Sequence, residues 1–198
     1  MRSSVVPHSP SNYPGEHPGD PGPGLATPRV WTVGHSTRPL AEFLELLEQH
    51  GVRSVADVRR FPASRRWPHF TGAALAASLR SHGIDYQWIP QLGGRRAPRP
   101  NSPNTGWRNA SFRGYADHMA SPEFAEGLDL LANLSLAEPT AVMCAESLWW
   151  RCHRALVADA LAWLGFEVRH ITGPASEVVH PGSAAARTVD GRLSYAAP

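Results

Sequence analysis

The sequence predicts a single α/β domain in which a mostly parallel five-stranded sheet carries helices on both faces. Between residues 29 and 171, short β-branched segments alternate with segments whose apolar residues recur at helical spacing. This alternation is typical of a parallel sheet with right-handed crossovers. The chain has 198 residues, the length of one domain. The prediction places that domain at residues 29–173.

The first strand is expected at residues 30–33, a short apolar run. The helix after it has apolar residues at i, i+3, i+4 and i+7 from Leu40, which is the pattern of one helix face. Pro39 in its first turn and Gly51 beyond its end are the usual helix boundaries. Residues 52–58 are the second expected strand.

A second helix is expected from Thr71, which can cap it, to Gly83, with Leu75 and Leu79 on its buried face. Residues 84–89 form the third predicted strand.

The second half of the domain begins with a long polar segment, residues 90–119, of a length that is usually functional or disordered. A helix follows from Ser121, and residues 139–144 have the continuous apolar character of a strand buried on both faces. A helix over 156–164 and a strand over 166–171 complete the pattern.

The two ends of the chain have a different composition. Residues 1–28 are rich in proline and glycine without apolar periodicity, so we expect a disordered arm. Residues 174–198 look similar and are expected to form a flexible tail. Both tails are predicted to be dispensable for folding.

Composition also limits the class of protein. No segment has the ~18 consecutive apolar residues of a membrane span, and the N-terminal residues lack the apolar block of a secretory signal. Cys144 and Cys152 are too few for a disulfide framework, so we expect a cytoplasmic protein without membrane contact. All 19 basic residues are arginine, but a net charge of +2 does not by itself indicate nucleic-acid binding.

Polar residues gather after the predicted strands, whose carboxyl ends meet at one edge of a parallel sheet, where ligands of such folds bind. The candidates for catalysis are Cys144, Glu146, His35 and His153. The candidates for substrate binding are Ser36, Asp57, Arg59, Ser64, Arg65, Gly93, Gly94, Tyr115, Cys152 and Arg154. We expect Arg59 and Arg154 to share this edge, each held by Asp57 or Glu146.

The segment from Cys144 to Arg154 joins a strand to a helix, and the free N–H groups at a helix start favour an anion. Arg151, His153 and Arg154 add positive charge to the same turn. A cysteine in such surroundings can become a thiolate. Considered alone, Cys144 is better explained as a small core residue than as a nucleophile, and it is the convergence of polar groups that indicates a site.

An ordered series of motifs resembles the family called domain of unknown function 488 over about residues 30–173. The series is T-V-G-H-S at 32–36, D-V-R at 57–59, P-x-S at 62–64, L-G-G at 92–94, F-x-x-Y at 112–115 and M-C-A-E…C-H-R at 143–154. The resemblance implies an α/β fold with these segments around one cleft, and it implies no particular reaction or cofactor.

Two better-understood patterns are only partly matched. An Asp-x-Arg after one strand and a cysteine after a later one is similar to rhodanese-type sulfurtransferases, but the compact loop of that family is replaced here by residues 146–151. A tyrosine-phosphatase-like loop needs an arginine six residues after the cysteine, where this chain has Trp150.

Three functions therefore compete. The favoured one is an enzyme that binds a phosphorylated or nucleotide-like anion and uses Cys144 as a nucleophile or redox thiol. The alternative is a nucleic-acid-binding module in which an arginine-rich loop presents Trp107, with Trp67 and Phe112, for base stacking. A metal site built from Cys144, Cys152, His153, His35 and His170 is disfavoured because no compact ligand spacing is present.

Overall fold

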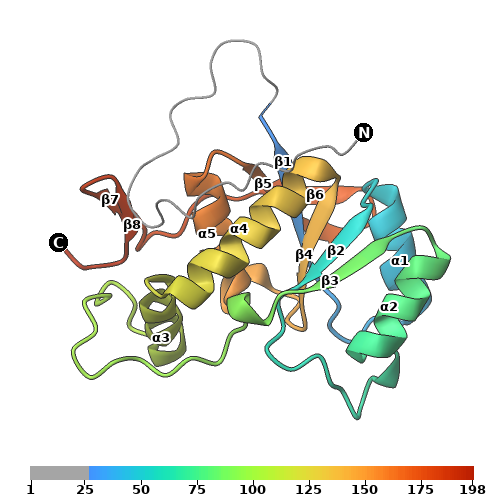
Figure 1. The fold of residues 1–198 in the computed structure, drawn as a ribbon, viewed down its shortest axis with the longest axis horizontal. Helices are drawn as coiled ribbons and strands as arrows, with labels where there is room; N and C mark the ends of the chain where they lie inside the picture. The colour runs from blue at the N-terminus through green and yellow to red at the C-terminus, as the bar shows by residue number, and fades with distance from the viewer. Residues whose placement is uncertain (1–26) are drawn as a thin grey trace, which may run out of the picture.

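A computed structural model describes residues 27–198, and the predicted arm at residues 1–28 lies almost wholly outside the described residues. The described chain has the predicted α/β fold, with helices on both faces of a mainly parallel sheet (Figure 1). Within residues 27–198, no helix combines the length and the apolar character needed to cross a membrane.

The central sheet has six strands in the order β3-β2-β4-β1-β5-β6. They are β1 (Arg29–Gly34), β2 (Ser54–Asp57), β3 (Asp85–Trp88), β4 (Thr140–Cys144), β5 (Glu167–Gly173) and β6 (Ser176–Val179). The first five strands are parallel to one another, and β6 is antiparallel to β5.

The C-terminal segment departs from the prediction. It supplies the sixth strand and a small hairpin of β7 (Arg187–Val189) and β8 (Arg192–Ser194), and Tyr195 is buried beside it. The expectation of a five-stranded sheet followed by a flexible tail is therefore wrong. These strands are only three or four residues long, too short for an apolar period to appear in the sequence.

The helices cover the two faces in pairs. Helices α1 (Leu40–Gln49) and α2 (Gly72–Ser81) pack on one face, and α4 (Pro122–Ala137) and α5 (Arg154–Trp163) pack on the other. Side chains of β4 alternate accordingly, because Met143 belongs to the α1–α2 core and Cys144 to the α4–α5 core. Ser121 caps α4 as predicted, but the Thr71 hydroxyl donates to the Pro68 carbonyl and does not cap α2.

The long polar segment contains a helix that the sequence did not indicate, α3 (Ala110–Met119), which begins after the Asn109 cap. Its buried Asp117 organises the loop before it: the carboxylate accepts hydrogen bonds from the Arg99 backbone, the Ser102 hydroxyl and the Asn104 amide. The arginine-rich loop is thus tied to a single buried carboxylate.

The connections after β1 and β4 leave the sheet in opposite directions. The chain runs from β1 to α1 on one face and from β4 to α5 on the other, although the two strands are neighbours. Such a reversal opens a crevice at the carboxyl ends of the two strands, the usual ligand position in open α/β sheets. Gly34 permits the close crossing there, because a Cβ atom on it would lie 2.0 Å from the Glu146 carbonyl oxygen.

Candidate functional site

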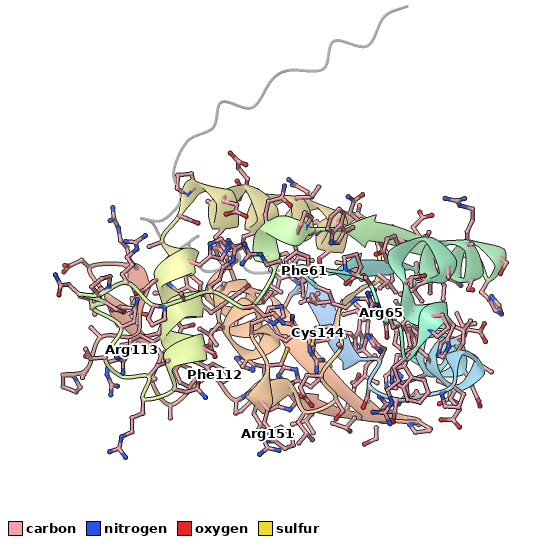
Figure 2. All side chains as sticks on the ribbon, turned by 90° about the horizontal axis from the view of Figure 1, so that it is seen from below. Phe61, Arg65, Phe112, Arg113, Cys144 and Arg151 are labelled. Carbon is pink, nitrogen blue, oxygen red and sulfur yellow. The ribbon has the colours of Figure 1, made fainter. Side chains whose placement is uncertain are left out.

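A cavity of about 660 Å³ opens at this reversal, and we call it the carboxyl-edge cleft. Its walls come from the loops after β1, β2, β3 and β4 and from one face of α3. Figure 2 looks onto this edge, with Cys144 between Phe61 and Arg65 on one side and Phe112 and Arg113 on the other.

The cleft brings together most of the residues that the sequence singled out. It is lined by His35, Ser36, Arg59, Ser64, Gly94, Tyr115, Cys144, Glu146, Cys152 and His153. Four predicted residues do not line it, namely Asp57, Arg65, Gly93 and Arg154. Asp57 and Arg154 are buried behind its wall, and Gly93 packs against the backbone of Arg60.

The two cysteines meet at the base of the cleft. Cys144 is the last residue of β4 and Cys152 comes two residues before α5, and their Sγ atoms are 2.8 Å apart. Both are free thiols, and their exposed fractions are only 2% and 7%. The sequence placed both residues at the site, but it could not show that their sulfur atoms touch.

Arg154 lies directly behind the sulfur pair and is 1% exposed. Its Nε donates to Cys144 Sγ at 3.0 Å, and its Nη2 donates to the backbone carbonyl of Glu146 at 2.5 Å. No carboxylate among residues 27–198 forms an ion pair with it. A buried guanidinium without an anion is costly, so the sulfur pair is the ionisable group placed to balance its charge.

The pKa values of the two cysteines are shifted in opposite directions. The hydrogen bond from Cys144, together with the Arg154 charge and the backbone N–H of Arg154, lowers the pKa of Cys152 to about 7. Burial raises the pKa of Cys144. These opposite shifts favour a thiolate at Cys152, with Cys144 as the thiol that donates to it.

His153 is placed to act as a base toward Cys152. Its Nε2 is 3.0 Å from the Val58 carbonyl oxygen, which can only accept, so Nε2 carries the proton of the neutral ring. The free lone pair on Nδ1 then faces Cys152 Sγ at 3.4 Å. Burial lowers the pKa of His153, which keeps the ring neutral. Gly94 allows this position, because a Cβ atom there would lie 2.7 Å from Nδ1.

His35 is less free to exchange protons. Its Nδ1 lies 3.0 Å from the Ser36 carbonyl oxygen, and its Nε2 lies 3.3 Å from Arg59 Nη1, so both ring nitrogens are occupied. Burial and the neighbouring Arg59 charge lower the pKa of His35 to about 4. Arg59 is in turn held by Asp57 through Nε and Nη2, and Tyr86 donates to the same carboxylate at 2.7 Å. Asp57 thus holds Arg59 as predicted.

A buried chain of hydrogen bonds connects Arg154 to the C-terminal segment. Arg154 Nη1 donates to Thr32 Oγ1 at 3.3 Å, and His170 Nδ1 lies 2.7 Å from that hydroxyl. His170 Nε2 contacts His180 Nδ1 at 2.9 Å, and His180 Nε2 contacts Asp159 at 2.8 Å. Arginine can only donate and a carboxylate can only accept. With neutral histidine rings, each group in the series therefore donates a hydrogen bond to the next one, from Arg154 to Asp159. We call this series the Thr32–Asp159 chain. No motif spacing in the sequence indicates it.

The outer part of the cleft is basic and aromatic. Arg60, Arg95 and Arg151 line it, and none of the three forms an ion pair with any residue in the described part of the chain. The one acidic side chain in the lining is Glu146, which is exposed. Phe61, with an exposed fraction of 63%, faces the cleft together with Phe112.

Comparison with protein families supports the resemblance drawn from the motifs. The family model described as Domain of unknown function DUF488 matches residues 39–161, well over half of the chain. The chain belongs to this family. The match includes the segments with Asp57, Gly94, Cys144 and Arg154 and begins after His35. No curated protein and no solved structure matches the chain.

The structure also gives information on the two other sites considered from the sequence, the base-stacking loop and the metal site. Trp107 stacks on Phe112 with ring centroids 4.7 Å apart and is flanked by Tyr195, so its ring is engaged in packing and is not a free stacking surface. Among residues 27–198, no three His, Cys, Asp or Glu side chains are arranged to hold a metal ion. His35 and His170 belong to the separate networks of Arg59 and Arg154.

Proposed function

We propose that this protein is a cysteine-dependent enzyme that binds a small phosphorylated or nucleotide-like anion in the carboxyl-edge cleft and attacks it with a thiolate. The observation that carries the proposal is the contact between the Cys144–Cys152 pair and a fully buried Arg154 without a carboxylate partner. A cation in this position stabilises a sulfur anion, which is the reactive form of cysteine.

Cys152 is better placed than Cys144 to be the nucleophile. Its pKa is lowered to about 7 by the hydrogen bond from Cys144 and by Arg154, and the free lone pair of His153 faces its sulfur. A thiol with a pKa near the working pH combines a useful thiolate fraction with good nucleophilicity. Cys144, whose sulfur accepts from Arg154 Nε and from the Glu146 backbone N–H, then serves as the donor that holds the thiolate in place.

The rim supplies the recognition of an anion. Arg95 and Arg151 form no ion pair among the described residues and are placed to bind phosphate oxygens, for which the planar guanidinium is well suited. Arg60 adds positive charge beside them, although its Nη1 donates to the Arg95 carbonyl and its guanidinium lies over the Phe61 ring. Phe61 provides exposed apolar surface for a flat ring, and the exposed Glu146 carboxylate is available to exchange a proton with the substrate.

The test measures the rate of alkylation by iodoacetamide against pH for the full chain and for Cys144→Ser and Cys152→Ser. We expect one thiol that titrates near pH 7, lost in Cys152→Ser and retained in Cys144→Ser, where the hydroxyl still donates to the thiolate. Arg154→Met should raise the thiol pKa by about one unit, which lowers the rate at pH 6 about tenfold. Arg65→Met, which removes an exposed arginine outside the cleft lining, is the control. Thiols that titrate only above about pH 8.5, the ordinary value, would overturn the proposal.

Ligand binding is tested in the same assay. Inorganic phosphate or adenosine monophosphate should slow alkylation of wild-type protein and should protect Arg151→Gln less. Protection by a single-stranded oligonucleotide with no effect of the small anions would favour the nucleic-acid-binding alternative.

A further inference from the structure

We infer that Cys144 and Cys152 form a reversible disulfide, so that the site also carries out thiol–disulfide exchange with small anionic disulfides. This inference rests on the proposed function in one respect, since it takes Cys152 as the attacking thiolate. It adds a second activity, a two-electron redox reaction that uses both sulfur atoms.

The geometry of the pair supports bond formation. The Sγ atoms are 2.8 Å apart, and a disulfide needs about 2.05 Å, so closure requires a movement of less than about 1 Å. Cys144 is fixed at the end of a central strand, where it pairs with Gly34 of β1. Cys152 follows the short 3₁₀ turn at Trp149–Arg151 and precedes α5 in an extended conformation. The turn between the cysteines can take up this movement without disturbing the sheet.

The reaction balances without any group beyond the two cysteines and the disulfide substrate. The Cys152 thiolate attacks one sulfur of the substrate, the substrate S–S bond breaks, and a first thiolate leaves behind a mixed disulfide on Cys152. Cys144 then attacks Cys152 Sγ, the mixed disulfide breaks, and the second leaving thiolate takes the proton of Cys144. The two cysteines lose two electrons and the substrate gains them.

Arg154 makes this disulfide easy to reduce. In the reduced state its guanidinium is balanced by the sulfur anion, whereas a disulfide carries no charge. Oxidation therefore leaves Arg154 buried without an anion, because no described carboxylate pairs with it. Stabilisation of the reduced form is the property of oxidising disulfides, which pass their bond on readily. The pair is thus suited to cycling and unsuited to a permanent structural bridge.

The rim of the cleft selects the charge of the substrate. Arg60, Arg95 and Arg151 surround the entrance without acidic partners among the described residues, against the single carboxylate of Glu146. A disulfide that carries carboxylates is attracted to this rim, and a disulfide that carries ammonium groups is repelled.

The experiment treats the reduced full chain with glutathione disulfide, which is anionic, and follows the products by intact-mass spectrometry. Wild-type protein should lose two hydrogens and return to the dithiol with excess reduced glutathione. Cys144→Ser should stop at a glutathione adduct on Cys152, and Cys144→Ala provides the same arrest if the serine variant is unstable. Cys152→Ser should react slowly.

The charge preference is tested by comparing two disulfides on the wild-type protein. Glutathione disulfide should react about tenfold faster than cystamine, which is cationic. Arg151→Gln should reduce that preference, while Arg192→Gln, on the exposed β8 away from the cleft, should not.

The outcomes separate this inference from the proposed function. A wild-type protein that accumulates the Cys152 adduct and forms no internal disulfide would overturn the inference and leave the nucleophile in place. A protein that forms neither product, and whose thiols react with iodoacetamide only above about pH 8.5, would overturn both.

Discussion

Two buried arginines, Arg59 and Arg154, lie at the carboxyl-edge cleft, and they differ in the type of group that accepts their hydrogen bonds. Arg59, on the α1–α2 side, is chelated by the Asp57 carboxylate, which also accepts from Tyr86. Arg154, on the α5 side, donates to a sulfur atom, a hydroxyl and two backbone carbonyls. The first cation is held and neutralised by a buried carboxylate, so it fixes the structure of its side of the cleft. The second faces the Cys144–Cys152 pair, in which the pKa of Cys152 is lowered to about 7, and our proposal gives it control of thiol reactivity.

The largest expected effect concerns the C-terminal segment, whose buried Tyr195 packs in the α4–α5 core on the Arg154 side. Ending the chain at Pro174 removes β6, the buried Tyr195 and His180, and leaves Asp159 without its two side-chain partners. We expect a loss of more than about 4 kcal/mol in the free energy of unfolding, as for other large core deletions. Urea denaturation measures it, and a loss within about 1 kcal/mol would restore the original prediction of a dispensable tail.

The next effect concerns the Arg59 side. Asp57→Asn keeps the shape of the side chain but leaves Arg59 buried without an anion, which typically costs about 3–5 kcal/mol. The matched control is Glu123→Gln, which removes the carboxylate that pairs with Arg96 and is 51% exposed. An exposed pair of this kind contributes less than about 1 kcal/mol. Equal losses of unfolding free energy in Asp57→Asn and Glu123→Gln would contradict the claim that the buried ion pair stabilises the fold more than the exposed one.

How far the sequence predicted these regions depends on the range of the interactions. Periodicity and end signals located α1 from Leu40 and α4 from the Ser121 cap, because both signals are local. Helix α3 was missed because two of its buried residues are Asp117 and His118, so its inward face is polar. Strands β6 to β8 were missed because each is only three or four residues long, too short for an alternating pattern to show, although each pairs with a strand next to it in the chain.

The candidate site shows the same limit. That polar residues would converge followed from the parallel order of the strands, and the cleft contains ten of the fourteen predicted residues. The Thr32–Asp159 chain could not be predicted, because Thr32 lies 138 residues from His170 and meets it only in the folded chain. The sequence also placed His180 in the expected flexible tail, so it was not predicted to belong to the site.

The smallest effect is a dependence of stability on pH that involves both sides. Burial and the nearest charged side chains lower the pKa of His35 to about 4 and that of His170 to about 3. Below pH 6.5 the unfolded state binds protons that the folded state does not, so stability is fully present above that pH and falls as the pH falls. We expect a loss of about 1 kcal/mol per histidine between pH 6.5 and 5.5. Urea denaturation across this range should show a shallower dependence in His35→Gln and in His170→Gln, and an unchanged slope in both would contradict the assignment.

The buried carboxylate of Asp117 has a consequence for the speed of ligand capture. By accepting from Arg99, Ser102 and Asn104 it holds the loop that leads from Gly94 and Arg95 to α3. A wall that is already ordered loses little conformational entropy when a ligand arrives. Association is then limited by diffusion and electrostatic attraction, without a preceding loop closure. For the anion that we propose as ligand, this wall of the cleft is therefore already in place before binding.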